Sequence, residues 1–296
     1  MCSLDTRVDN FMQAPAAAAM FVLADRLGLN AERLAEPATV TALASAALRD
    51  LNPWTGEAAA NRVRALALVQ PLRDLVTAVV TDLRNAWWSA PLDRGAQLLL
   101  TGQDDPQRDP MHLQPPHGPI DAWEAYAQKP LRSIATSAEL PVAHDEPIHS
   151  GAHAELSCGS SDWDAVYPVQ QVRLQVSSTA RVYEVDSAAD WHDLVRRYGD
   201  WATHPGSDDN LRDAAGIDNG PAPTWSRVAD DYDGVHLSFA GLLTGLYVPH
   251  PTAGVSTTLW AWNWESTHWL RSVFISATTL DDLPQAPGDP DYYCPW

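Results

Sequence analysis

The sequence predicts an α+β protein in which a helical N-terminal domain is followed by a mixed α+β C-terminal domain. Residues 1–100 are rich in alanine and leucine at helical spacing, whereas strand-like patterns begin only at residue 169. All 10 histidines and 10 of the 13 tryptophans lie beyond residue 110. Residues 101–296 also carry nearly all of the net charge of −19. Side chains that titrate, ligate and stack are therefore concentrated in the second part.

Helical patterns occupy most of residues 1–100. One helix is predicted from Phe11 to about Leu27, ending at Gly28, because glycine readily adopts the left-handed conformation that follows a helix. Thr55 is a candidate N-cap for a second helix, and Pro71 would open a third. In residues 72–88 apolar side chains recur at steps of three and four, which predicts a helix with one buried face.

The composition changes at residues 101–119, which are rich in proline and glycine and have no hydrophobic period. This segment is predicted to be an exposed linker between a helical domain at 1–100 and a functional α+β domain at 120–296. Residues 203–224, rich in Asp, Gly, Asn and Pro, are predicted to form a long surface loop.

Four short segments of the C-terminal domain are strand candidates, and a helix is expected between the second and the third. Alternating or β-branched residues predict the strands, and apolar residues at helical spacing predict the helix. The strand candidates are Val169–Val176, Arg181–Asp186, Val235–Phe239 and Leu270–Ile275, and the helix candidate is Ala188–Tyr198.

The charge and the cysteine pattern limit the classes of partner. A net charge of −19 repels phosphate and anionic lipid, so neither nucleic acid nor a membrane surface is expected as a partner. No apolar run reaches the about 18–20 residues that cross a bilayer. Cys2, Cys158 and Cys294 are far apart and form no CxxC pair, and no signal peptide is recognised, so a cytoplasmic protein is predicted. A small molecule or a basic protein is the expected partner.

The segment 258–271 is the densest aromatic stretch. In an extended chain Trp260, Trp262 and Trp264 would share one face, and Glu265 would lie on the opposite face. The three indoles either fill a core or contact a flat ligand, and the core is the commoner use of such residues. A carboxylate beside them either reaches solvent, has a dedicated partner or serves as a general base, so Glu265 is the candidate catalytic residue.

Residues 144–155 contain three histidines and three carboxylates. A four-residue spacing of His149 and His153 suits a zinc site on a helix, but Pro147 and Gly151 would interrupt that helix. We therefore predict a solvated acidic loop, with no metal site assigned to His144, His149 and His153.

Cations and hydroxyls gather in residues 126–137. Lys129, the only lysine, and Arg132 precede Thr136 and Ser137, and such a set could hold a phosphate or a carboxylate. The same residues could equally form an ordinary strand edge.

Residues 120–280 resemble a group of uncharacterised actinobacterial proteins. The resemblance is carried by four short segments and implies an origin without implying an activity. The segments are Trp123–Pro130 with the Thr-Ser pair that follows, Arg181–Asp186, Asp233–Ser238 and Trp264–Leu270.

A second resemblance is to ADP-ribosyltransferases, which use NAD. Thr136 and Ser137 are similar to part of that family's Ser/Thr strand, and Glu265 precedes a late strand candidate as the family's catalytic Glu does. The resemblance implies stacked aromatics for the nicotinamide ring and Arg132 for the pyrophosphate. Arg181 follows the Ser/Thr element, whereas the family's Arg or His precedes it, so Arg94 or His117 would have to substitute. The ligand-binding residues expected are Lys129, Arg132, Thr136, Ser137, Arg181, Trp262, Trp264 and His268.

Three hypotheses for function follow. The first is an enzyme with an aromatic-lined pocket that transfers ADP-ribose from NAD, with Glu265 stabilising an oxocarbenium-like centre. The second is a non-catalytic protein whose acidic surface captures a basic partner. The third is a tailoring enzyme of actinobacterial secondary metabolism that holds a planar substrate.

Overall fold

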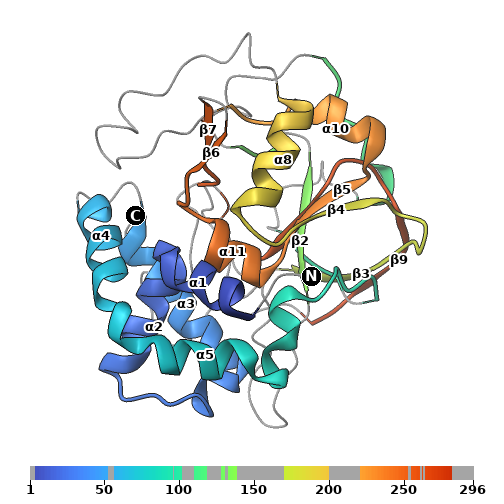
Figure 1. Cartoon of the computed structure of the whole chain (residues 1–296). Coiled ribbons are helices and arrows are strands. Elements are labelled where there is room, and N and C mark those ends of the chain that lie inside the picture. The colour runs from blue at the N-terminus through green and yellow to red at the C-terminus, as the bar shows by residue number, and fades with distance from the viewer. Residues whose placement is uncertain are drawn as a thin grey trace.

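The computed structural model describes residues 4–52, 57–95, 97–101, 110–118, 128–130, 133–138, 170–199, 221–252, 255–260, 262 and 264–281. Over these residues the protein is α+β, as the sequence predicts. A group of N-terminal helices packs beside a curled mixed sheet that carries further helices (Figure 1).

Prolines begin two of the N-terminal α-helices. Pro15 and Pro37 open two of them at the first turn, where the missing N–H costs nothing. The α-helices are α1 (Leu4–Gln13), α2 (Pro15–Arg26), α3 (Pro37–Leu51), α4 (Ala58–Leu68) and α5 (Arg73–Thr81), and the 3-10 helices are η1 (Arg33–Ala35), η2 (Gln70–Leu72) and η3 (Leu83–Ser89).

Two predicted helices are each divided in the structure. The helix expected from Phe11 to Leu27 breaks at Ala14, which is extended because a residue before proline disfavours the helical conformation. Gly28 follows α2 with φ of 67°, the left-handed conformation expected of it. The pattern over 72–88 becomes α5 and η3, because Asp82 is extended and its side chain caps Arg84 N–H.

Among the described residues, seven strands form the main sheet in the order β4-β5-β8-β2-β1-β3-β9, and two form a small antiparallel pair. The seven are β1 (Gln97–Thr101), β2 (Ile134–Ala138), β3 (Gln170–Val176), β4 (Val182–Val185), β5 (Gly234–Leu237), β8 (Ser266–Trp269) and β9 (Phe274–Thr279). The pair is β6 (His250–Thr252) with β7 (Val255–Thr257), and the remaining helices are α8 (Ala188–Tyr198), α10 (Trp225–Asp231), α11 (Phe239–Gly245) and the 3-10 helix η4 (Pro110–His112).

The predicted strand Leu270–Ile275 is wrong in its bounds. Residues 266–269 form β8 and residues 274–279 form β9, and the chain turns between them. Leu270 is fully buried at this turn, so its hydrophobicity reflects core packing at a strand end and not membership of a strand. Glu265 therefore directly precedes β8.

The sheet has two faces with different surroundings. We call the helix face the one formed by Tyr183, Val185, Val235 and Leu237, which packs with α8 and α11. Strand alternation turns the next residues to the opposite side. We call this the inner face, formed by Glu184, His236, Thr267, Thr136 and Trp269, whose order across the strands follows from their register.

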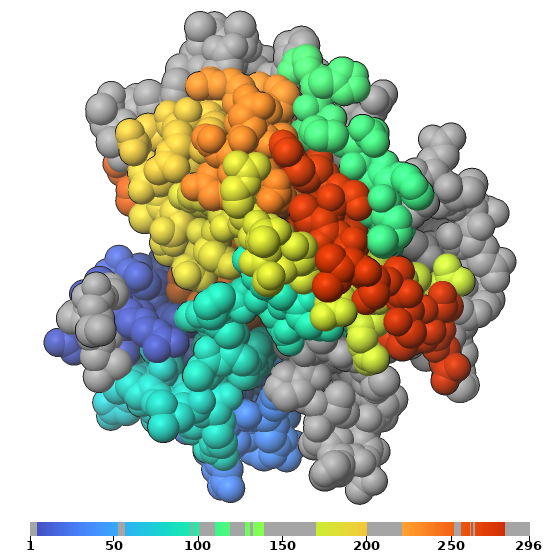
Figure 2. All heavy atoms as spheres, turned by 90° about the vertical axis from the view of Figure 1, so that its right-hand side faces the viewer, coloured from blue at the N-terminus to red at the C-terminus, as the bar shows by residue number. Residues whose placement is uncertain are grey.

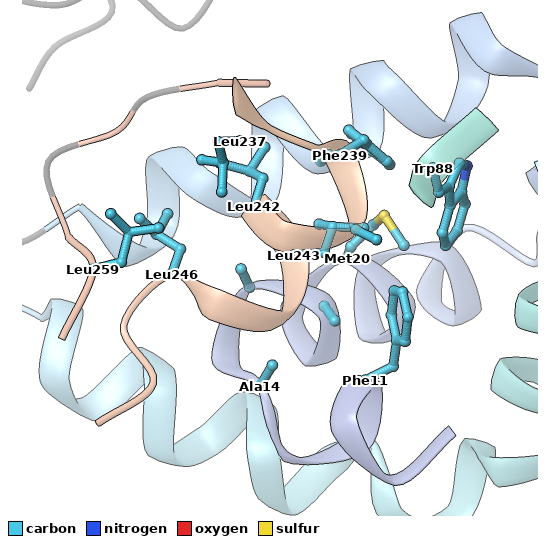
Figure 3. Close-up of a cluster of buried hydrophobic side chains, with 14 of the residues drawn as sticks. Phe11, Ala14, Met20, Trp88, Leu237, Phe239, Leu242, Leu243, Leu246 and Leu259 are labelled. Carbon is cyan, nitrogen blue, oxygen red and sulfur yellow. The ribbon is translucent and has the colours of Figure 1, made fainter. Parts of the chain in front are cut away.

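One hydrophobic core joins the N-terminal helices to α11. Phe11, Met20 and Trp88 lie beside Phe239 and Leu243 (Figure 3). Figure 2 shows from another side that the blue and cyan N-terminal part lies directly against the yellow C-terminal part. A second cluster, which includes Leu99, Ile134, Leu174, Trp269 and Phe274, fills the inside of the curled sheet.

The expected domain boundary at residue 100 falls inside β1, which pairs with β2 and β3. Of the expected linker 101–119, the structure describes Thr101 and residues 110–118. The division into domains 1–100 and 120–296 stays a prediction, and the shared core makes it testable.

Phe239→Ala should destabilise both halves together. The ring is 1% exposed and its centroid lies 4.9 Å from that of Trp87 and 5.4 Å from that of Trp88. Removing a buried Phe costs about 3–5 kcal/mol. Far-UV circular dichroism and tryptophan fluorescence should therefore report one coincident transition at a lower temperature. Ile275→Ala, at an exposed position, is the control and should leave the transition in place. Two separated transitions would favour independent domains.

Candidate acid–base site

Parallel pairing of β4 with β5 places Glu184 directly beside His236 on the inner face. The carboxylate of Glu184 is hydrogen-bonded to Nδ1 of His236. Neighbouring strands lie about 4.8 Å apart, so register neighbours on one face are within reach of each other. The contact thus follows from the register of the two strands.

Glu265 approaches the same imidazole from the chain entering β8. Its Oε1 lies 3.0 Å from Nε2 of His236. Its Oε2 accepts a hydrogen bond of 3.2 Å from the backbone N–H of Ala138, the last residue of β2. Both ring nitrogens of His236 therefore face carboxylates. We call Glu184, His236 and Glu265 the acid–base site.

The three side chains differ in their access to solvent. The side chain of His236 is 4% exposed, that of Glu265 7% and that of Glu184 33%. Oε1 of Glu184 also accepts a 3.3 Å hydrogen bond from Leu92 N–H. Glu184 is thus the end of the site that solvent or a ligand can reach, and Glu265 is the enclosed end.

The imidazole is held in its charged form. Burial by itself would lower the pKa of His236, but the hydrogen bonds and charges of Glu184 and Glu265 outweigh it and raise this pKa to about 9. At neutral pH both ring nitrogens then donate to carboxylates, and a single positive charge is shared between two negative ones.

A third carboxylate, that of Asp186, follows directly after β4. Burial raises the pKa of Asp186, although a hydrogen bond with Ser238 opposes the shift, and the charges of Glu184 and Asp190 raise it further. Ser238 follows β5 and caps α11 by accepting a 3.0 Å hydrogen bond from Gly241 N–H. The carboxyl ends of two parallel strands therefore assemble acidic and hydroxyl groups, a common location for ligand sites.

Polar side chains continue along the inner face from β8 to β1. Thr136 donates a 2.6 Å hydrogen bond to Gln97 and accepts one of 2.8 Å from the indole of Trp269. Trp269 fits because it lies over Gly234, where an added Cβ would approach its ring to 2.8 Å. Thr267 has a buried hydroxyl without a partner among the described residues.

The structure brings several predicted site residues onto neighbouring strands but divides them between the faces. Thr136 is part of the inner face, and Glu265 contacts His236 there. His268 pairs in register with Val235 and lies on the helix face. There Nδ1 of His268 is 3.1 Å from the hydroxyl of Ser133. Ser137, next to Thr136 on β2, is buried and points away from the inner face.

The tryptophans of 260–264 belong to the core. Trp262 and Trp264 are each 1% exposed, and the indole N–H of Trp262 donates to the carbonyl of Gln128 at 3.0 Å. Trp260 is also buried. The sequence left open whether these indoles fill a core or contact a flat ligand, and their burial fits the core. Glu265 does lie opposite Trp264, as alternation predicts.

Arg181 lies at the other end of the parallel strands. Its Nη2 is 3.1 Å from Asp233, which also pairs with Arg271. Arg94 donates to the carbonyls of Ser177 and Ala180, so it ties the turn between β3 and β4 and stands apart from the acid–base site.

The remaining predicted residues are not at the acid–base site as the structure describes it. Lys129 is half-buried beside Gln128, and His117 is exposed. Arg132, the histidines of 144–155 and Cys158 lie outside the described residues. Sequence reasoning missed Glu184 and His236, although both lie in segments that were singled out. The sequence did indicate the two short strands that carry these residues. It did not indicate that the two strands pair in parallel, which is what places Glu184 beside His236.

Stability should fall as pH rises from 6.5 to 9. The pKa of His236 is raised from 6.5 to about 9, so the stabilisation from its protonation is complete below pH 6.5 and is lost as pH approaches 9. Tyr183, whose pKa burial raises to about 12, titrates above this range. The melting temperature should drop by about 5 °C or more across the interval.

His236→Gln should flatten this dependence, because the titrating group is gone. Glu184→Gln should move the loss to lower pH, because one of the two acceptors that raise the pKa of His236 is neutralised. A wild-type melting temperature that is constant from pH 6.5 to 9 would contradict the assignment.

Within the described ranges, no group of three or more His, Cys, Asp or Glu side chains is arranged to hold a metal ion. No helix formed by these residues is both long and apolar enough to span a bilayer. Compared with known protein families, curated proteins and solved structures, the chain matches none of them.

Proposed function

We propose that the protein is an acid–base enzyme that acts on a small molecule at the acid–base site. The observation that carries the proposal is a buried imidazole whose two ring nitrogens contact two carboxylates, of which Glu184 is 33% exposed and Glu265 only 7%. Residues with perturbed pKa values and unequal access to solvent are typical of sites that transfer protons.

Each residue has a separate role in this proposal. Glu184 takes a proton from a substrate hydroxyl or from a water molecule and returns it to the leaving group or to solvent. His236 keeps its own proton and orients the Glu184 carboxylate through the hydrogen bond between Nδ1 and Glu184. Glu265 is a positioning residue that fixes the ring of His236.

Glu265 is the residue that the sequence proposed as the catalytic carboxylate. Both oxygens of Glu265 are engaged, by His236 and by Ala138 N–H, as both oxygens of Glu184 are by His236 and Leu92 N–H. The two carboxylates differ in exposure, and the 7% exposure of Glu265 against 33% for Glu184 favours a positioning role for Glu265. The catalytic assignment of Glu265 stays a prediction, and paired variants can decide between it and Glu184.

NAD remains the first substrate to test. A carboxylate at the carboxyl ends of β4 and β5 could stabilise the positive charge that develops on the ribose as nicotinamide leaves. The buried Trp262 and Trp264 give no support to a stacking role for a planar substrate. Capture of a basic protein and a biosynthetic tailoring role both stay predictions.

Glu184→Gln should retain the fold and lose about two or more orders of magnitude in turnover, because the substitution keeps the shape and removes the proton acceptor. Glu265→Gln should lower turnover less and shift the pH profile, because it acts through His236. The measurements are nicotinamide release from NAD and the melting temperature of the same preparation. Asp193→Asn, an exposed carboxylate on α8, is the control.

The outcomes separate the two carboxylates. Glu265 would be the catalytic residue if Glu265→Gln is folded but inactive while Glu184→Gln turns over at the wild-type rate. Normal turnover in both would remove the acid–base site from the mechanism. A wild-type protein that releases no nicotinamide would reject NAD, and a small molecule found bound by native mass spectrometry would then be the substrate for the same variants.

A further inference from the structure

Arg62 on α4 is a buried cation that has no counter-ion among the described residues. The residue is 7% exposed. Its Nη1 donates a 3.3 Å hydrogen bond to the carbonyl of Leu51, and its guanidinium carbon lies 5.2 Å from the ring centre of Tyr247. No carboxylate among the described residues forms an ion pair with it.

This arrangement differs from that of other arginines that make internal contacts. Arg181 and Arg271 share Asp233, and both terminal nitrogens of Arg94 donate to carbonyls. Burying an unpaired charge is costly, so such residues normally have a partner of opposite charge. Burial correspondingly lowers the pKa of Arg62, and the charge interaction with Tyr247 opposes this shift without outweighing it.

The guanidinium has donors that no described residue satisfies. Nη1 donates to Leu51, whereas Nε and Nη2 make no hydrogen bond with the described residues. We call the side that carries Nε and Nη2 the open edge of Arg62, in the sense that no described residue accepts from it. One planar edge with free N–H groups is the part of arginine that binds carboxylate or phosphate in a bidentate manner.

The backbone of Tyr247 is in an unusual conformation. Its φ of 62° is costly for a residue with a bulky side chain. The conformation is held in place by a 2.8 Å hydrogen bond from its N–H to the carbonyl of Leu259. Strained residues of this kind often mark ligand sites, and here the strain accompanies the placement of an aromatic ring against the guanidinium.

We propose that Arg62 and Tyr247 form a binding site for a small oxyanion, the carboxylate or phosphate group of a metabolite. The open edge of Arg62 donates to two oxygens of the anion, and the ring of Tyr247 keeps the guanidinium in position. The site is separate from the acid–base site, because it joins α4 to the segment after α11 while Glu184 and His236 lie on the inner face of the sheet.

The test is the thermal unfolding of the full chain titrated with inorganic phosphate and, separately, with acetate, with sodium chloride keeping the ionic strength constant. An anion that binds only the folded state should raise the melting temperature in a saturable way, by about 3 °C or more. The two titrations show whether the site prefers phosphate or carboxylate.

Arg62→Met should lose the response to anions. Without anion it should be as stable as the wild type or more stable, because an apolar side chain replaces an unpaired buried charge. Arg64→Met, on the exposed side of the same helix, is the matched control and should respond as the wild type does. Arg62→Lys, which keeps the charge without the fork, should weaken binding about tenfold or more.

Three results would overturn the proposal. The first is a wild-type protein that responds to neither anion. The second is an Arg62→Met variant that responds as the wild type does, which would indicate a general salt effect. The third result applies if Arg62→Met does not fold. In that case an Arg62→Lys variant that binds the anion as tightly as the wild type does would overturn the proposal.

Discussion

The parallel pairing of β4 with β5 is the constraint on which much of the described structure depends. It fixes Glu184 beside His236 on one face. By strand alternation it also presents Tyr183, Val185, Val235 and Leu237 to α8 and α11 on the other face. A shift of one residue in either strand would exchange the faces, placing an imidazole in an apolar core and leucine among carboxylates. Core packing and site geometry therefore depend on the same register.

The helix face and the inner face of the sheet are stabilised by different interactions. On the helix face, apolar side chains join α11 to the N-terminal helices, so the packing of Phe11, Met20 and Trp88 helps to hold the carboxyl end of β5. On the inner face, the polar groups are hydrogen-bonded to one another, since His236 contacts two carboxylates whose outer oxygens accept from Leu92 and Ala138 N–H groups. The buried His236 and Glu265 need these partners because burial removes them from water.

Local patterns in the sequence predicted what depends on local interactions. Steps of three and four residues predicted helix in residues 72–88, and alternation correctly placed Glu265 opposite Trp264. The sequence analysis predicted one continuous helix across Ala14, although Pro15 indicates a break there. The partnership of Glu184 with His236 could not be predicted from spacing, because it joins strands about fifty residues apart whose pairing is a tertiary property. The strand bounds predicted near Leu270 were wrong for a related reason. A hydrophobic residue buried at a turn gives the same sequence pattern as one in a strand.

The two hydrogen bonds of His236 also bear on the dynamics of the inner face. An imidazole with one free nitrogen can rotate about its ring axis on a fast timescale. The ring of His236 cannot rotate without breaking contacts to Glu184 and Glu265 together. Its motion is therefore tied to the separation of β5 from both the end of β4 and the start of β8. Opening of the sheet and reorientation of this ring should be a single slow event.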